Sequence, residues 1–153
     1  MDIHAKLREL NLELPKVPAA VAQYVPALRS GNQIYVSGQL CTREGHLIAQ
    51  GPVPTAVSLE EAQAATRQCV LNALAAVDQA IEGDWSMFVR VVRLAVYVNS
   101  HADFNLQHKV ANGGSELLGE LFGEAGRHVR AAVGVSSLPL GATVEAELLV
   151  EVR

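Results

Sequence analysis

The stretch RAAVGVSSLPLGATVEAELLVEV, residues 130–152, holds the pattern that decides the fold. Its second half alternates between two sets of side chains, which is the period of a β-strand over residues 143–152. One face takes Val144, Ala146, Leu148, Val150 and Val152, and the other takes Thr143, Glu145, Glu147, Leu149 and Glu151. A preceding strand is predicted over residues 128–136, and Pro139 with Gly141 marks the connection between the two strands.

Further towards the N-terminus, residues 88–99 (FVRVVRLAVYVN) are rich in β-branched and aromatic side chains, which favours another strand. We expect this strand to be largely buried on both sides. Strict alternation puts Phe88, Val92, Leu94, Val96 and Val98 on one face, and Val91, Arg93, Ala95, Tyr97 and Asn99 on the other.

A long helix is predicted just before that strand. Ser58 with Glu61 three residues later is typical of a capping box, which satisfies free N–H groups at a helix start. Small apolar residues, mostly alanine, then recur at helical spacing as far as Gly83. Such a stripe lets the helix axis come close to a neighbour, which suits packing on a sheet.

A second helix is expected after the strand. It should begin behind Ser100, with Asp103 completing a similar Ser-x-x-acid start, and run towards Phe122. The sequence Asn-Gly-Gly at 112–114 predicts an interruption or kink in it, because glycine weakens a helix interior.

The N-terminal third predicts shorter elements. In chain order these are a short helix or a loose segment at 2–11 with Ile3, Leu7 and Leu10 on one side, a β-hairpin of strands 25–30 and 33–38, a strand and turn at 42–49 around Glu44 and Gly45, and a loop at GPVPT (51–55). The order is therefore β-β-β-α-β-α-β-β. It predicts one α+β domain over residues 1–153, with 1–17 as an extension, built as a mixed sheet with both helices on one face.

Composition limits the function classes. The chain has 153 residues and 50% hydrophobic residues against 18% charged, so we expect some apolar surface to lie in a subunit interface, a second copy covering the open sheet face. A net charge of -4 with scattered basic residues argues against nucleic-acid partners. The amphipathic N-terminus and the short apolar runs indicate neither signal peptide nor membrane span, so a cytoplasmic protein is expected.

Two charges stand out in otherwise apolar strands: Arg130 in HVRAAVGV and Glu145 in ATVEAELLV. A guanidinium in such a strand needs an anionic partner, and at a cleft it is suited to bind a carboxylate with two hydrogen bonds. The residues alone leave two interpretations open. Arg130 either pairs with Glu145 or an interface acid as a structural ion pair, or it binds a small anionic ligand.

Four stretches carry a resemblance to a known family: Tyr24 seven residues before Gly31, GNQIYVSGQL (31–40), VYVNSHADFN (96–105) and RAAVGVSSLPLGATVEAELLVEV (130–152). From about residue 18 to the C-terminus the chain resembles the Rid family of reactive-intermediate deaminases, also called the YjgF type, some members of which are named endoribonuclease L-PSP. The last stretch is the strongest match. The segment VANGGSELLGELFGEAGRHVR (110–130) is similar to a divergent branch of that family.

The resemblance implies a fold like that of bacterial-type chorismate mutase, assembled as a homotrimer with ligand clefts between neighbouring subunits. It implies hydrolysis of enamine or imine intermediates to 2-keto acids and ammonia, with no metal or organic cofactor. By the same resemblance Arg130 would bind the substrate carboxylate, Glu145 would orient a water, and Tyr24 and Ser37 would line the pocket. The family's cysteine two positions after the arginine is Ala132 here.

The family's pocket asparagine has two equivalents in this longer chain. Counting forward from Phe104 reaches His108, counting back from Arg130 reaches Asn112, and we favour Asn112. Tyr24 and Ser37 also have plain structural interpretations, as packing at the hairpin edge and as a partner for a backbone group.

Other residues and activities are weaker candidates. His4, His46, His101, His108 and His128 have no metal-binding spacing, and Cys41 and Cys69 form no CxxC. Cys41, just past SGQL, is either a buried apolar residue or a neighbour of the cleft. A non-catalytic metabolite-binding or regulatory trimer remains the alternative function. A ribonuclease would need a basic stripe, which the sequence does not show. A chorismate mutase would need several cations around its dianionic substrate, and the sequence offers one arginine for the cleft, so both activities are less favoured.

Overall fold

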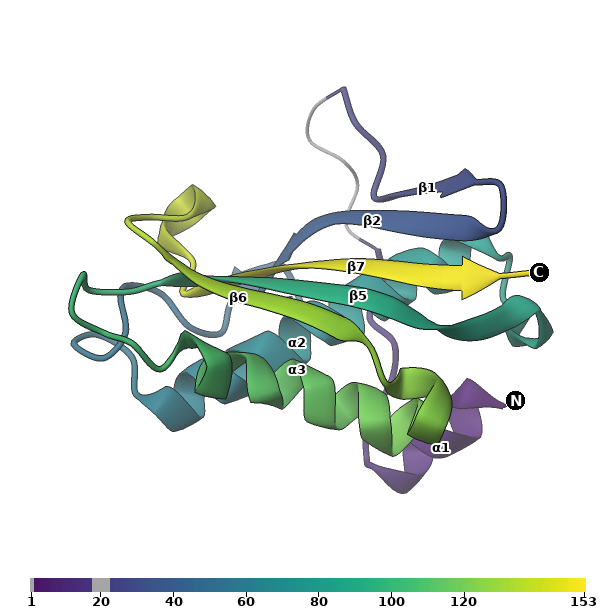
Figure 1. Ribbon diagram of the computed structural model, residues 1–153, viewed down its shortest axis with the longest axis horizontal. Helices are drawn as coiled ribbons and strands as arrows, with labels where there is room; N and C mark the ends of the chain where they lie inside the picture. Colours follow the sequence, from purple (N-terminus) through teal and green to yellow (C-terminus); the bar gives the residue numbers. More distant parts are fainter. Residues whose placement is uncertain (1, 18–22) are drawn as a thin grey trace.

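The computed structural model describes residues 2–17 and 23–153, which form a mixed sheet with helices against one face (Figure 1). The five strands lie in the order β1-β2-β7-β5-β6, and only the β5–β6 pair is parallel. The strands are β1 (Ala27–Ser30), β2 (Gln33–Leu40), β5 (Phe88–Asn99), β6 (Val129–Val135) and β7 (Val144–Val152), with a separate small hairpin of β3 (Thr42–Arg43) and β4 (His46–Leu47). The helices are α1 (Ile3–Glu9), α2 (Leu59–Ala80) and α3 (Gln107–Phe122), and single 3-10 turns lie at η1 (Trp85–Met87), η2 (Gly123–Gly126) and η3 (Pro139–Gly141).

The α+β class, the mixed sheet and the placement of the two long helices on one face are as predicted. The hairpin of β1 and β2 turns at Gly31, whose φ of 61° is the left-handed conformation that glycine adopts without cost. Glu44 and Gly45 make the predicted turn between β3 and β4. The N-terminal segment is a helix that buries Ile3 and Leu7, because one apolar face of α1 packs against the rest of the chain.

The predicted capping box starts α2. Ser58 Oγ accepts from the backbone N–H of Glu61 at 3.2 Å, and a Glu61 carboxylate oxygen accepts from the backbone N–H of Ser58 at 2.8 Å. The alanine-rich stripe that follows is buried from Ala62 to Val77, and the helix contacts β2 and β7. The helix therefore lies flat on the centre of the sheet.

The predicted start of α3 at Ser100 is wrong. The backbone N–H of Ser100 donates to the carbonyl of Val135 at 3.2 Å, and Ser100 forms a bridge with Val53, so it still belongs to the edge of the sheet. The chain then loops, and the helix begins at Gln107 without a side-chain cap. A capping pattern was therefore present at a residue whose backbone was already engaged in the sheet.

The predicted kink at 112–114 is also wrong, because α3 runs unbroken through these residues (Figure 1). The two glycines serve close packing. A Cβ on Gly113 would collide with the backbone carbonyl of Gln63 in α2, and one on Gly114 would lie 2.9 Å from Val70 Cγ2. Glycine at these positions lets the two helices approach each other more closely than any other residue would.

The predicted faces of β5 hold only in its second half. The pairing with β7 shifts register twice, between Phe88 and Arg90 and between Val91 and Arg93, and each irregularity reverses the alternation. Val91 is thereby fully buried, whereas Val92 is only partly buried. The exposed side chains of the first half show that the strand is not buried on both sides along its whole length.

The sheet face opposite the helices is open in the single chain. Tyr35, Val129 and Val133 lie on this face and are 49%, 66% and 45% exposed. Among residues 2–17 and 23–153, no helix combines the length and the apolar character needed to cross a bilayer.

The packing of α3 on α2 gives the first prediction. Gly113→Ala should destabilise the protein, by about 2 kcal/mol or more, because the added methyl group meets a backbone carbonyl that cannot easily move. Gly119→Ala, in the same helix, adds its methyl group in open space and should stabilise by about 0.5 to 1 kcal/mol. Urea unfolding at one fixed protein concentration measures both variants, and equal stabilities would contradict the packing described here.

Candidate functional site

Arg130 lies near the start of β6 and points its side chain towards α3. In the parallel ladder it is paired with Leu94, which is fully buried on the helix side of the sheet. Its Nη1 donates to Asn112 Oδ1 and to Ser115 Oγ, both at 3.0 Å, and its Nη2 donates to the backbone carbonyl of His108 at 3.1 Å. Because residues 108, 112 and 115 are one turn apart on α3, a single face of this helix supplies all three acceptors.

The charge of Arg130 has no counter-ion within the part of the chain that the structure describes, since no carboxylate oxygen there lies within 4.0 Å of its guanidinium. All three acceptors are neutral oxygens, and the side chain is solvent-exposed. A guanidinium carries five N–H donors, so two of them remain for a ligand. The arrangement holds the side chain in one orientation and leaves its charge available.

Glu145 lies on the opposite face of the sheet. It is paired with Tyr97 of β5 and Leu40 of β2, and its side chain covers Gly38, where a Cβ would collide with the carboxylate. Burial raises the pKa of Glu145 above its ordinary value, and the nearby charge of Glu147 raises it further. A carboxylate with a raised pKa is a better proton acceptor, which suits a general base.

The structural ion pair between Arg130 and Glu145, one of the two interpretations of the sequence, is therefore excluded within the chain. Arg130 shares the helix side with Leu94, whereas Glu145 shares the other side with Tyr97. One strand, β5, also lies between them, because Arg130 is on β6 and Glu145 is on β7. One small molecule cannot contact both side chains of the same protomer.

Tyr24 and Ser37 belong to the Glu145 half of the chain. Ser37 Oγ donates to the carbonyl of Pro26 at 3.0 Å, and the Ser37 backbone N–H donates to the same oxygen at 2.9 Å. These bonds fasten the segment that carries Tyr24 to β2, next to Gly38 and Glu145. Tyr24 itself is 51% exposed. The candidate residues thus fall into two groups on opposite faces of the sheet, one at the β6 edge and the other over β2 and β7.

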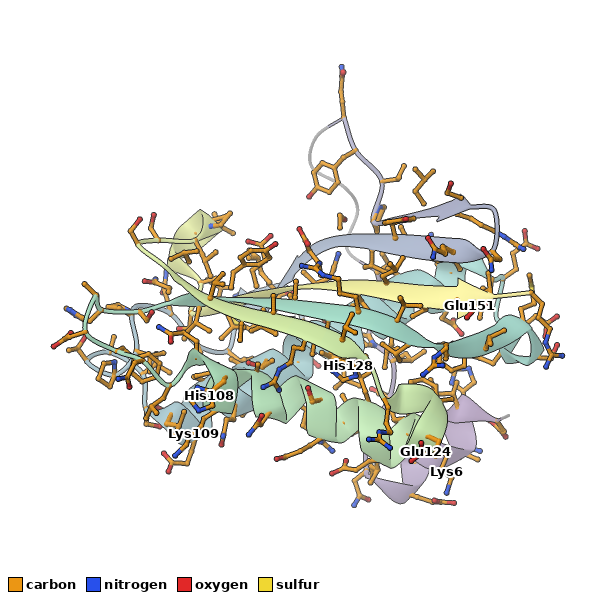
Figure 2. The ribbon with its side chains drawn as sticks, in the orientation of Figure 1. Lys6, His108, Lys109, Glu124, His128 and Glu151 are labelled. Atoms are coloured by element: carbon orange, nitrogen blue, oxygen red, sulfur yellow. The ribbon has the colours of Figure 1, made fainter. Side chains whose placement is uncertain are left out.

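The two candidates for the pocket asparagine lie one turn apart on the same face of α3. Asn112 contacts Arg130 through its side chain, whereas His108 does so through its backbone carbonyl. Ser115, which the sequence did not single out, and His128 join this group: Ser115 Oγ lies 3.0 Å from His128 Nε2. Figure 2 labels both His108 and His128. The spacing of 108, 112 and 115 was the available signal for Ser115, but it becomes meaningful only once a partner strand is known.

Two hollows lie apart from Arg130. A cleft of about 680 Å³ lies at the carboxyl ends of β5 and β6 and is lined by neutral polar side chains, among them Asn99, Ser100 and Gln107. Another, of about 710 Å³, lies between α1, the segment after it and α2. In the described residues no three His, Cys, Asp or Glu side chains converge in a way that could hold a metal ion.

Cys41 and Cys69 are both fully buried, and their thiols lie close enough to interact. A hydrogen bond from the Cys69 thiol lowers the pKa of Cys41 to about 6, whereas burial raises the pKa of Cys69. Neither side chain reaches the surface, so Cys41 does not line an open cleft in the single chain.

The fold is a mixed five-stranded sheet covered on one face by helices, with the exposed Arg130 on an edge strand. A family model described as "YjgF/chorismate_mutase-like, putative endoribonuclease" matches residues 4–152. The chain therefore belongs to the YjgF/Rid family, as its sequence motifs indicated.

Similar proteins cover almost the whole chain. Protein TCP17 of Trypanosoma cruzi is 42% identical over 152 residues, which is 99% of this chain and 94% of that protein. The crystal structure of Atu1372 from Agrobacterium tumefaciens, described as of unknown function, is 44% identical, with a TM-score of 0.93 over 99% of this chain and 92% of that one. The YjgF gene product of E. coli is more distant, at 25% identity and a TM-score of 0.63, covering 90% of this chain and 94% of that one.

The raised pKa of Glu145 gives a stability prediction. Because the folded state holds the proton more tightly than the unfolded state, stability falls as pH rises from the ordinary pKa of 4.5 through the raised value. Glu145→Gln, which does not titrate, should therefore be more stable than the wild type at pH 7, by less than about 1 kcal/mol because the group is still partly hydrated. Below pH 4 this gain should vanish. Denaturant unfolding at both pH values measures the difference in stability between Glu145→Gln and the wild type. A variant that is less stable than the wild type by the same amount at both pH values would contradict the prediction.

Proposed function

We propose that this protein hydrolyses reactive 2-imino acids and their enamine tautomers to 2-keto acids and ammonia. The observation that carries the proposal is the state of Arg130: three neutral oxygens orient its guanidinium, no carboxylate in the described chain neutralises it, and two N–H groups remain. Such a group is prepared for a ligand carboxylate. Membership of the YjgF/Rid family is consistent with this kind of role.

The proposed reaction needs little from the protein. Arg130 binds the substrate carboxylate and so places the electrophilic C2 carbon of the iminium group. Glu145 accepts a proton from a water molecule while the water oxygen bonds to C2. Glu145 then gives this proton to the nitrogen of the tetrahedral adduct, and the C–N bond breaks to release ammonia. The hydroxyl of the adduct loses its proton to solvent as the C2 carbonyl forms. The raised pKa of Glu145 favours its role as the proton acceptor.

The opposite placement of Arg130 and Glu145 leads us to propose that each cleft is shared by two protomers. In a head-to-tail ring, the β6 edge of one chain meets the β1–β2 edge of the next, and a rotation that closes after three copies gives the homotrimer. Arg130 and Asn112 would then come from one protomer, and Glu145, Tyr24 and Ser37 from its neighbour. The apolar side chains on the open sheet face would be covered by the same assembly.

The activity test uses a 2-imino acid generated in place by an amino-acid oxidase, with the release of 2-keto acid and ammonia followed against a buffer control. Arg130→Ala should lower kcat/KM at least about tenfold, because a charge-assisted bidentate contact is lost. Arg127→Ala is the matched control, since Arg127 lies three residues away, is exposed and contacts Glu124 instead. No acceleration by the wild type with several imino acids would refute the proposal.

Sharing of the cleft is tested by mixing two inactive variants. Arg130→Ala and Glu145→Gln trimers are unfolded, combined in equal amounts and refolded. About a quarter of the wild-type activity should return, because about one cleft in four then pairs an intact Arg130 with an intact Glu145 of the neighbour. If both residues acted from one protomer, mixing would restore nothing.

The alternative function, a non-catalytic metabolite-binding or regulatory trimer, depends on the same arginine. It is favoured if calorimetry shows 2-keto acids binding to the wild type and not to Arg130→Ala, while no imino acid is turned over faster than in buffer.

A further inference from the structure

His128 is held in a defined tautomer by the chain around it. Its Nδ1 lies 2.6 Å from the backbone carbonyl oxygen of Gly126. A carbonyl oxygen only accepts hydrogen bonds, so Nδ1 must carry the proton. In the neutral imidazole, Nε2 then has a free lone pair and is an acceptor.

The direction of the remaining bonds follows from this tautomer. Ser115 Oγ lies 3.0 Å from His128 Nε2, so its hydroxyl donates to the imidazole. The lone pairs of the same oxygen then face Arg130, whose Nη1 donates to it at 3.0 Å. The bonds run one way, from Arg130 to Ser115 to His128 to the Gly126 carbonyl, and each polarises the next.

We propose that Ser115 and His128 are positioning residues for Arg130, and that this chain of hydrogen bonds sets the orientation in which the guanidinium meets a ligand carboxylate. The inference rests on the proposed function, because it assumes that Arg130 binds the carboxylate. It assigns no contact between the substrate and either Ser115 or His128.

His128 has a specific task in this arrangement. A serine inside a helix commonly donates its hydroxyl to the carbonyl four residues earlier in the same helix, which for Ser115 is the carbonyl of Ala111. His128 offers a competing acceptor on the other side and so turns the hydroxyl away from the helix. The lone pairs of Ser115 are thereby directed at Arg130.

The end of the chain of bonds is fixed by packing. Gly126 is buried in the turn that follows α3, and a Cβ at this position would collide with the carbonyl of Leu118. Since the turn lies directly against the helix, the Gly126 carbonyl has a set position relative to Ser115. His128, which is partly buried between them, has little freedom to rotate.

The test compares Ser115→Ala, His128→Leu and His128→Gln, with pyruvate binding measured by calorimetry and turnover of an imino acid by steady-state kinetics. Ser115→Ala and His128→Leu should each raise the pyruvate Kd and the KM about tenfold and change kcat far less. The reason is that each variant removes or misdirects the Ser115 acceptor of Arg130, so that the guanidinium is no longer oriented for the ligand carboxylate. His128→Gln should recover most of the affinity, since its amide oxygen can accept from Ser115. The double variant Ser115→Ala with His128→Leu should be no worse than either single variant.

A spectroscopic readout separates positioning from general packing. In nitrogen-15 spectra of the wild type, His128 should show the Nδ1–H tautomer, and pyruvate should shift its Nε2 signal. Ser115→Ala should abolish that shift, whereas Ser115→Thr, which keeps the hydroxyl and guards against a folding defect, should preserve it.

The outcomes distinguish this inference from the proposed function. If Arg130→Ala loses binding while Ser115→Ala and His128→Leu bind pyruvate like the wild type, the inference is overturned and the function stands. If His128→Gln is as weak as His128→Leu, or if the double variant is additive, His128 acts through packing and the inference also fails. If Arg130→Ala binds and turns over like the wild type, both fall together.

Discussion

The guanidinium of Arg130 is held by three oxygens from one face of α3, and the rest of the structure keeps that helix face at the right distance from β6. Gly113 and Gly114 seat α3 closely on α2, and a Cβ on Gly114 would also lie 3.2 Å from Cδ2 of Leu94, the β5 residue beside Arg130. Helix packing, sheet register and the arginine's orientation are thus coupled. A shift of α3 would remove all three acceptors together.

The same geometry underlies the proposal that two protomers share one site. The charge of Arg130 is oriented at the β6 edge of the sheet, while Glu145, with its pKa raised by burial, lies over Gly38 of β2 on the other face. Each half has a feature that is unfavourable alone: a guanidinium without an anion and a carboxylate in a partly dry environment. In the assembly proposed above, joining two protomers would bring the two halves together and cover apolar side chains such as Tyr35.

Much of the architecture could be predicted because local signals and tertiary structure agree. The capping box at Ser58, the hairpin at Gly31 and the alternation of residues 143–152 are such cases. The wrong predictions, for the start and the kink of α3 and for the faces of β5, share one cause: the same sequence pattern is compatible with two local structures. Glycines 113–114 mark either a break or a close approach, and only the neighbouring helix decides between them. Likewise, the irregular register of β5 depends on its partner strand, so alternation alone misplaced Val91.

For the site, the resemblance supplied Arg130 and Glu145, but no sequence pattern states that they face opposite sides or that Ser115 and His128 support the arginine. The most direct measurement of the central claim is a crystal structure of the protein with pyruvate bound. The account predicts the carboxylate on the two N–H groups of Arg130 that Asn112, Ser115 and His108 do not use, with Glu145 of a neighbouring protomer across the cleft. Pyruvate bound elsewhere, or Arg130 paired with a carboxylate of a neighbouring chain, would contradict it.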